Sequence, residues 1–543
     1  MDEAGISMGS VVRSTLWLTA GNLVNRVLGL GYRVLLGRFL GPTWLGLFQL
    51  AMSLYFSLLT PVVAGLPDAV ARVTARSGAG HPALPGVIAR TAWIAAAGVG
   101  VPAAWLFLTG WTPPGPGWQE ARQAVPLAWF LPALVFAALS AVVRGFFLGA
   151  DLSRLIVLAQ LAEQVVRVGA LALVLAVGGR LPMAPLLVLI LLLVAGEAVG
   201  FGLTRWWYRR VVGETPGPGA GGGGRRTPRP RGAHQGAGQP GRGREPGDGA
   251  TEPPTLWEVV TLAGPATVER VLLSAARLVE VTLIPTRLVQ AGLTVHQALG
   301  VYGELSGLAT PLLLLPTVFS GALAAALVPA VAEAERDRDR LGNQVRRCVT
   351  LSLHLGVLAA VLFAREGHLL AQLIFPGQVV GDYPGAGRLA SWIAPAALLL
   401  YTDQVAAAVL RGLGRPLEPM LVDLASAATR VGILALAIRP GIPPEEAVRL
   451  VCLAVMADVA VAGCGNLAFA LWRTGTRPDP VGWVVLPACA GLAALWITDG
   501  LGSLLGTGLV ARLGAWLPAA AAVAVIAWAA AAPSRPARPS LPT

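Results

Sequence analysis

Residues 14–59 read STLWLTAGNLVNRVLGLGYRVLLGRFLGPTWLGLFQLAMSLYFSLL. The stretch holds two long apolar runs, and each is long enough to cross a hydrocarbon layer of about 30 Å as a helix. Arg26 and Arg33 interrupt the first run. A charged side chain in the middle of a span costs roughly 2.5–3.5 kcal/mol on insertion scales, so we expect these two arginines to have a function.

The same pattern of apolar runs continues along nearly all of the 543 residues. Hydrophobic residues make up 55% of the chain and charged residues only 13%, well below the roughly 25% typical of soluble domains. The first run is too long for a signal peptide and lacks a cleavage site of small residues. We predict an all-α polytopic membrane protein with about fourteen transmembrane helices, over 12–36, 45–66, 87–110, 123–147, 155–177, 183–207, 256–284, 299–330, 348–364, 389–411, 417–438, 446–472, 481–499 and 507–531.

The chain divides into four predicted regions. Residues 1–210 form a first lobe of six helices, and 255–475 form a second lobe of six. Between them, 211–254 are rich in Gly, Pro and Arg, a composition that cannot bury a core and predicts a disordered cytoplasmic linker. Residues 476–543 hold two additional helices and a tail.

The two lobes show internal sequence similarity. NRVLGLGYRV (25–34) aligns with ERVLLSAARL (269–278), VVRGFFLG (142–149) with VLRGLGR (409–415), and RVGALAL (167–173) with RVGILAL (430–436). Six predicted helices separate the members of each pair, so the repeats have the same orientation and are parallel. Parallel repeats around a central cavity are typical of transporters, which bind substrate at the repeat interface.

Basic residues predict the orientation in the membrane. With both termini in the cytoplasm, the cytoplasmic loops collect most arginines, for example Arg72, Arg209 and Arg338, as the positive-inside rule requires. This placement in a cell membrane explains the net charge of +12 without a nucleic-acid partner. The linker arginines could also contact anionic membrane lipids.

The interrupting arginines form two matching stripes. Asn22, Arg26 and Arg33 share one face of a helix. In the second repeat Arg270 and Arg277 are seven residues apart, as Arg26 and Arg33 are, and Ser274 lies on the same face. One interpretation is structural, with Arg33 reaching the membrane surface and Arg277 pairing with Glu280. We favour a second, in which both stripes line a water-filled cleft between the lobes. Guanidinium groups there would bind the phosphate oxygens of a substrate.

Several acidic residues also fall within predicted spans. Glu163 with Arg167, and Asp423 with Arg430, are expected to form structural ion pairs. Candidates for coupling transport to a proton or sodium ion are Glu304, Glu197, Asp403 and Asp458. The four cysteines have no CxxC spacing, so we expect no metal site, and no cofactor is expected. The chain contains no lysine, which excludes a P-loop and Schiff-base catalysis.

Three segments resemble a known family. Residues 15–73, 300–334 and the motif VLRGLGRP (409–416) are similar to the stage V sporulation protein B / polysaccharide biosynthesis family. That family belongs to the MOP flippase superfamily, which also includes the MurJ-type lipid II flippases. Arg26 matches the first cavity arginine of the flippase pattern SRVLGFxR, and Arg33 matches the second after a shift of one residue. Where those flippases carry YADRL, this chain has YGEL with Glu304.

The resemblance implies a flippase that moves an undecaprenyl-pyrophosphate-linked saccharide outward by alternating access. Such a protein would serve cell-wall, polysaccharide or spore biogenesis and would not be an enzyme. One alternative is a drug/cation antiporter of the same superfamily, for which an acidic cavity is expected. A second is a membrane-embedded glycan-modifying enzyme, but the five histidines are scattered and do not form a catalytic group with paired acids.

Overall fold

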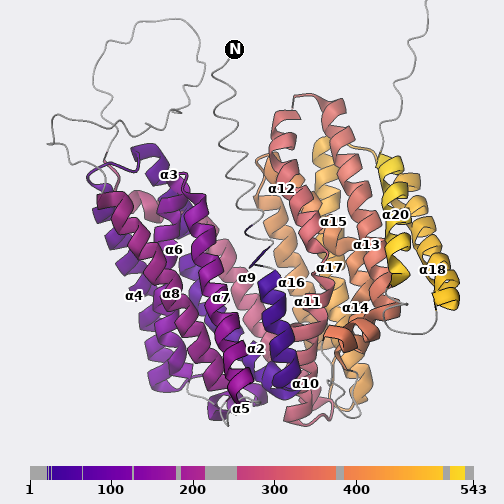
Figure 1. Cartoon of the computed structure of the whole chain (residues 1–543), viewed down its shortest axis with the longest axis horizontal. Coiled ribbons are helices and arrows are strands. Elements are labelled where there is room, and N and C mark those ends of the chain that lie inside the picture. The colour runs from indigo at the N-terminus through magenta and orange to yellow at the C-terminus, as the bar shows by residue number, and fades with distance from the viewer. Residues whose placement is uncertain are drawn as a thin grey trace, which may run out of the picture.

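A computed structural model describes residues 21, 24–25, 27–63, 65–124, 127–178, 185–213, 253–334, 336–374, 385–505 and 514–531. Within these ranges the chain forms helices and turns and no strand (Figure 1). Eleven of the described helices are long and apolar enough to cross a membrane. The predicted class of all-α, multi-pass membrane protein is confirmed. The total of fourteen spans stays a prediction, because the first span and the linker lie partly or wholly outside the described residues.

The first lobe is a bundle built from residues before the linker. It lies on the left of Figure 1, in indigo to magenta. In chain order its helices are residues 27–39, α2 (Pro42–Val63), α3 (Leu66–Ser77), α4 (Leu84–Thr109), α5 (Pro116–Ala124), the 3₁₀ turn η1 (Leu127–Phe130), α6 (Leu131–Gly149), α7 (Ser153–Gly178) and α8 (Pro185–Gly213). The short helix α5, which the sequence analysis does not predict, follows α4.

The second lobe repeats this order with the remaining helices. It comprises α9 (Leu256–Gln290), α10 (Val295–Glu304), the π turn η2 (Leu305–Ala309), α11 (Thr310–Leu313), α12 (Thr317–Ala334), α13 (Arg338–Ile374), α14 (Ala386–Ile393), the 3₁₀ turn η3 (Ala394–Ala396), α15 (Ala397–Gly412), α16 (Leu417–Leu436) and α17 (Pro444–Thr474). The π turn η4 (Val481–Val485), α18 (Leu486–Leu505) and α20 (Trp516–Ala531) follow. The last two pack on α13 at the outer edge of this lobe, and Arg365 of α13 pairs with Asp499 of α18 (Figure 1).

Equivalent helices pack in the same way in both lobes. In the first, α3 packs on α6, α4 on α6 and α7 on α8; in the second, α12 packs on α15, α13 on α15 and α16 on α17. The aligned glycines explain one of these contacts. A Cβ added to Gly145 would lie 2.6 Å from the carbonyl oxygen of Pro67, and one added to Gly412 would lie 2.8 Å from that of Val328. Only glycine allows backbones to approach so closely. The predicted parallel repeat is therefore confirmed in the packing.

The predicted single span over 299–330 is wrong. The chain instead forms α10, the π turn η2, the four-residue α11 and, after a turn at 314–316, α12. Two prolines cause the break. Pro311 and Pro316 lack the N–H that an uninterrupted helix would use, and their rings clash with the preceding turn. The eighth helical segment is thus broken near its middle.

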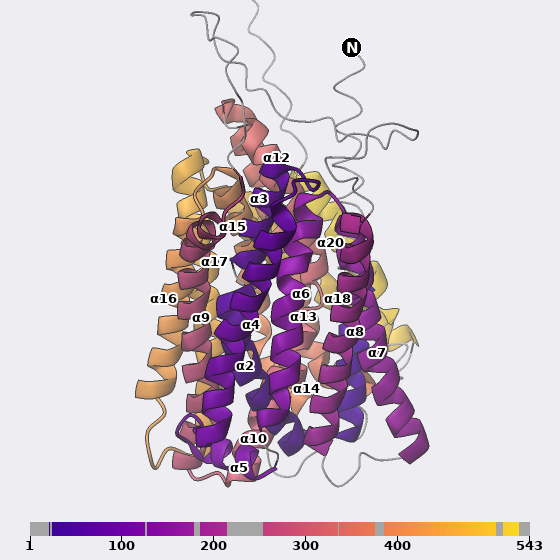
Figure 2. The same ribbon diagram turned by 90° about the vertical axis from the view of Figure 1, so that its left-hand side faces the viewer.

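The two lobes meet along α2 and α3 on one side and α9 and α10 on the other. Figures 1 and 2 show α5 and α10 together at one end of the bundle, with α3 and α12 at the other. At the first of these ends the backbones touch, because a Cβ on Gly46 would overlap the carbonyl oxygen of Leu299. The indole N–H of Trp118 in α5 also donates to the Thr282 hydroxyl of α9 at 2.9 Å. The lobes are therefore in direct contact at the α5/α10 end.

Candidate functional site

Arg33 lies at the boundary between the lobes. Its side chain is exposed and lines a pocket of about 380 Å³ together with Gly29 of the same helix. The opposite wall is the break in the eighth segment, including Pro311 and Leu315, and α15 contributes Gln404. The pocket therefore lies beside a discontinuous helix, and transporters place their binding sites at such helices.

The rest of the first stripe can be placed only in part. Asn22 and Arg26, two of its predicted members, lie outside the described residues. Asn25, one turn before Gly29, donates to Gln160 of α7 at 3.4 Å and so holds the helix against its own lobe.

The second stripe is split between two surroundings. Arg277 lines a different pocket, of about 260 Å³, between α9, α15, α16 and α17. Ser274 is half-buried, and Arg270 is exposed and lines neither pocket. The two pockets lie on different sides of α15, whose neighbouring residues Asp403 and Gln404 face one each. Arg33 and Arg277, which occupy equivalent positions in the two stripes, therefore line separate pockets in this conformation.

Of the four candidate acids, Glu197 is engaged within the first lobe. The Arg167 guanidinium contacts Glu197 at 3.4 Å and Glu163 at 2.8 Å, and Arg144 contacts Glu163 at 3.1 Å. The Tyr55 hydroxyl donates to Glu197 at 3.3 Å. Two carboxylates and two guanidinium groups thus form a buried network without formal net charge. The predicted structural pair Glu163–Arg167 is confirmed.

A related arrangement occurs in the second lobe. Arg430 of α16 donates to Glu280 of α9 at 2.6 Å and also pairs with Asp458 of α17. The two arginines are equivalent by sequence, since 430 − 167 = 263, and Asp458 falls near the position of Glu197, since 458 − 197 = 261. The expected pair Asp423–Arg430 is wrong, because Arg430 reaches two other helices instead. The alternative interpretation, in which Arg277 pairs with Glu280, is also wrong, because Glu280 pairs with Arg430. The alignment of RVGALAL with RVGILAL is the signal that could have indicated this.

The remaining two candidate acids differ from each other. Asp403 accepts a hydrogen bond of 2.7 Å from the Asn466 amide. Glu304, at the end of α10, is only 3% exposed, and its Oε1 has no hydrogen-bond partner in the described part of the chain. A buried ionised carboxylate without a partner is strongly unfavourable, so Glu304 is the acid with the most to gain from binding a cation or proton.

Comparison with known proteins shows which family and which folds this chain resembles. Residues 11–217 match the family described as polysaccharide biosynthesis protein. Stage V sporulation protein B of Bacillus subtilis (strain 168) is 26% identical over 449 residues, which cover 79% of this chain and 78% of that protein. The predicted family resemblance is confirmed.

Two similar solved structures are a transporter and a flippase by their descriptions. An inward-facing multidrug resistance MATE transporter of the MOP superfamily is 12% identical, with a TM-score of 0.59 over 85% of this chain and 98% of that one. The lipid II flippase MurJ in an inward closed conformation is 11% identical, with a TM-score of 0.55 over 94% and 98%. At these identities the likeness establishes the fold alone.

Sequence reasoning missed several residues that build the site. Gln404 faces Arg33 across the boundary pocket, yet nothing in its sequence surroundings marks it. The sequence analysis considers Glu280 only as a partner for Arg277, which lies on the same helix. Contacts between helices that are distant in sequence can be identified only once the fold is known. The repeat alignment predicts such contacts only where both copies keep the same residue type.

Proposed function

We propose that this protein is a membrane flippase for a saccharide linked to a lipid through pyrophosphate, and that it works by alternating access. The observation that carries the proposal is the position of Arg33, which lines a pocket between two parallel repeats, opposite a broken helix. A guanidinium group can bind phosphate oxygens in a bidentate fashion and so replace part of their hydration. The family resemblance supports the same substrate class.

The remaining residues of the two stripes are proposed to contact the substrate at other steps of transport. Asn22 and Arg26 would bind the headgroup with Arg33, and Arg270, Ser274 and Arg277 would do so from the second lobe when the lobes rearrange. In alternating access, one repeat rocks against the other around the bound substrate, so residues in separate pockets in one state can face a shared cavity in another. Glu304 is proposed as the group that couples transport to a proton.

The proposed orientation places the α3/α12 end in the cytoplasm of a cell membrane. Arg72 and Arg76 of α3 and Arg338 at the start of α13 then lie on the cytoplasmic side, as the positive-inside rule requires. With this orientation the α5/α10 end, where the lobes touch, is external, and the headgroup moves toward it.

The proposal is tested with purified protein in liposomes that contain a polyprenyl-pyrophosphate disaccharide. Flipping exposes the saccharide on the far leaflet, where a soluble galactosyltransferase can label it. We expect labelling beyond the fraction seen in empty liposomes, and mass spectrometry of the purified protein should find polyprenyl pyrophosphate species bound. If neither labelling nor bound carrier exceeds the control, the flippase proposal is wrong.

One observation favours a second candidate, a cation antiporter. The Arg277 pocket holds four carboxyl groups, from Glu280, Asp403, Asp423 and Asp458, against two guanidinium groups. An excess of acids suits a positively charged substrate. Uptake of a fluorescent quaternary ammonium compound into the same liposomes under a pH gradient would support this activity in place of flipping.

A further inference from the structure

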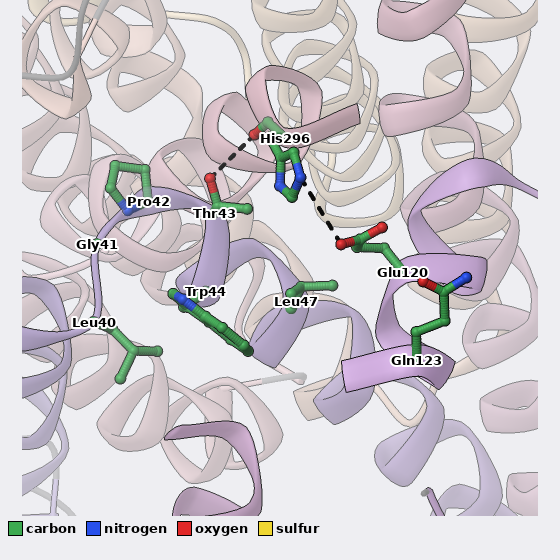
Figure 3. A pocket seen from close by; sticks show the side chains of 9 residues that line it. All are labelled: Leu40, Gly41, Pro42, Thr43, Trp44, Leu47, Glu120, Gln123 and His296. Atoms are coloured by element: carbon green, nitrogen blue, oxygen red, sulfur yellow. Dashed lines mark hydrogen bonds and ion pairs between the residues drawn. The ribbon is translucent and has the colours of Figure 1, made fainter. Parts of the chain in front are cut away.

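A third pocket, of about 470 Å³, opens at the α5/α10 end of the bundle (Figure 3). Both lobes build it. The first lobe supplies residues 40–44 and 47, around the start of α2, and Glu120 and Gln123 from α5, whereas the second lobe supplies His296 from α10. The pocket is distinct from the Arg33 pocket, with which it shares no lining residue.

The polar groups of this pocket bridge the two lobes. The Thr43 hydroxyl donates to the carbonyl oxygen of His296 at 3.2 Å, and His296 Nε2 lies 3.9 Å from Glu120 Oε1. Figure 3 shows the side chains of His296 and Glu120 directed toward one another, with the Trp44 indole nearer the start of α2. A capping box between Thr294 and Gln297 fixes the first turn of α10 and so the position of His296.

The lining offers a mixture of donors and acceptors beside an aromatic ring. Glu120 accepts hydrogen bonds, the Gln123 amide both donates and accepts, and the imidazole of His296 can do either. The first backbone hydrogen bond of α2 joins Leu45 N to Gly41 O at 3.0 Å, so the N–H groups of Thr43 and Trp44 precede it and have no partner within the helix.

This chemistry discriminates between ligand classes. A phosphate would meet the Glu120 carboxylate and no arginine or lysine in the lining, and an acyl chain would lie against the polar side chains of Glu120, Gln123 and His296 without bonding to them. A saccharide suits the pocket, because each hydroxyl both donates and accepts while the C–H face of the ring packs on an indole. The volume lies within the range of small-molecule sites, about 300–1,000 Å³.

We propose that this pocket is a saccharide-binding subsite at the exit end of the transport path, an inference that rests on the proposed function. A neutral sugar bound there contacts both lobes at once. It therefore favours the conformation in which the lobes touch at the α5/α10 end, because a ligand shifts an equilibrium toward the state it binds more tightly. The sugar comes either from the headgroup just transported or from soluble glycan outside the cell.

The test uses the full chain in nanodiscs and the soluble disaccharide chitobiose, with binding followed by saturation-transfer NMR. We expect wild type to bind, and Trp44→Ala to weaken binding by about tenfold, equivalent to about 1.4 kcal/mol. Gln123→Ala, at an exposed position where the fold does not depend on the side chain, should weaken binding as well. Trp111→Ala removes another exposed tryptophan outside the pocket and should bind as wild type does.

Competition with a lipid-linked disaccharide identifies the source of the sugar. Displacement of chitobiose assigns the subsite to the transported headgroup, and lack of displacement assigns it to soluble glycan; both outcomes support the subsite. Absence of chitobiose binding by wild type, or equal binding by wild type, Trp44→Ala and Gln123→Ala, overturns it. Because chitobiose binding is measured without transport, a failure here leaves the flipping result unaffected, and the reverse also holds.

Discussion

Arg33 illustrates how a membrane helix can carry a charge. Its side chain lines a pocket together with the broken helix and Gln404, and an open pocket of this kind can hydrate the guanidinium group and so reduce the cost of the charge. The same surroundings make it available to a ligand, since no acidic side chain lines that pocket. A charge that is solvated but unpaired is suited to binding an anion transiently.

Replacing Arg33 tests this role. We expect Arg33→Ala to reduce flipping at least about tenfold, a loss near 1.4 kcal/mol, while protein abundance stays close to wild type. Arg33→Lys should restore part of the activity, because an ammonium cannot form the bidentate contact. Arg38→Ala, on the same helix but outside the pocket, is the matched control. Wild-type flipping by Arg33→Ala would contradict the anion-binding role.

Glu304 is the acid whose protonation should matter. Glu304→Gln keeps the shape of the side chain and removes its charge, so we expect a folded protein whose transport no longer responds to an imposed pH gradient. Glu197→Gln is the comparison, because Glu197 is paired with Arg167 and its loss should lower stability instead. Transport measured at several pH gradients separates the two, and an unchanged gradient response in Glu304→Gln excludes proton coupling through this residue.

Residue by residue, the sequence predicts a charged face well and its surroundings poorly. Helical spacing places Gly29 and Arg33 on one face, and both line the boundary pocket. The same spacing places Arg270 and Arg277 on one face of α9, yet only Arg277 lines a pocket. The spacing of residues along a helix predicts the direction in which each side chain points around the helix axis. The position of the neighbouring helices along that axis determines what each side chain contacts.

Among the elements, α9, α16 and α17 are joined by one side chain, Arg430. Removing it leaves Glu280 and Asp458 buried close together without their cation. We expect Arg430→Ala to lower the free energy of unfolding by about 3–5 kcal/mol, as for other broken buried pairs. Arg76→Ala, which removes an exposed ion pair with Glu258, should cost no more than about 1 kcal/mol. Thermal unfolding in detergent measures both, and equal melting temperatures would refute the structural role of Arg430.

The contact between α2 and α10 depends on glycine. A Cβ on Gly303 would lie 2.5 Å from the carbonyl oxygen of Pro42, whereas one on Gly300 would meet nothing closer than 3.5 Å. We expect Gly303→Ala to force the helices apart at a cost of about 1–3 kcal/mol and to populate states separated at the α5/α10 end. Spin labels at Arg122 and Gln290 should then report longer distances, while Gly300→Ala should leave them unchanged. Unchanged distances in both variants would show that this contact does not govern closure.

Breaks within a helical segment could not be predicted from the sequence pattern. The run over 299–330 is apolar throughout, and length and hydropathy alone favour one helix. The run contains Pro311 and Pro316, but isolated prolines are tolerated in membrane helices. Their presence in the sequence therefore does not distinguish a kink from a break. Packing against α2 and α14 stabilises the interrupted form, and that packing is a property of the fold.

For the whole molecule, the proposed orientation makes a direct prediction. In a chain without its native cysteines, Gln290→Cys near the α5/α10 end should react with a membrane-impermeant maleimide on intact cells. Arg338→Cys near the α3/α12 end should react only after the membrane is permeabilised. Both positions are exposed in the structure, so labelling depends on the side of the membrane. The opposite pattern would reverse the assignment of the external end.

The architecture could be predicted from sequence because it is repeated. Two copies of RVGALAL-like and RGxxLG-like segments gave the parallel symmetry, which the Gly145 and Gly412 contacts confirm. The short helix α5 has no counterpart signal, since its nine residues are too polar to be read as a span. Its Trp118 nevertheless joins the lobes, a contact across 164 residues of sequence that no local pattern encodes.

The two buried charge networks differ in when they can form during synthesis on the ribosome. Arg167 lies 4 residues from Glu163 and 30 residues from Glu197, so the first network can be completed as soon as α8 has emerged. Arg430 is 150 residues beyond Glu280, so α9 must enter the bilayer carrying an acid whose partner has not yet been translated. During that interval Glu280 bears the cost of an unpaired intramembrane charge. The second lobe is thus the more vulnerable half of this chain to quality-control proteolysis while it is being made.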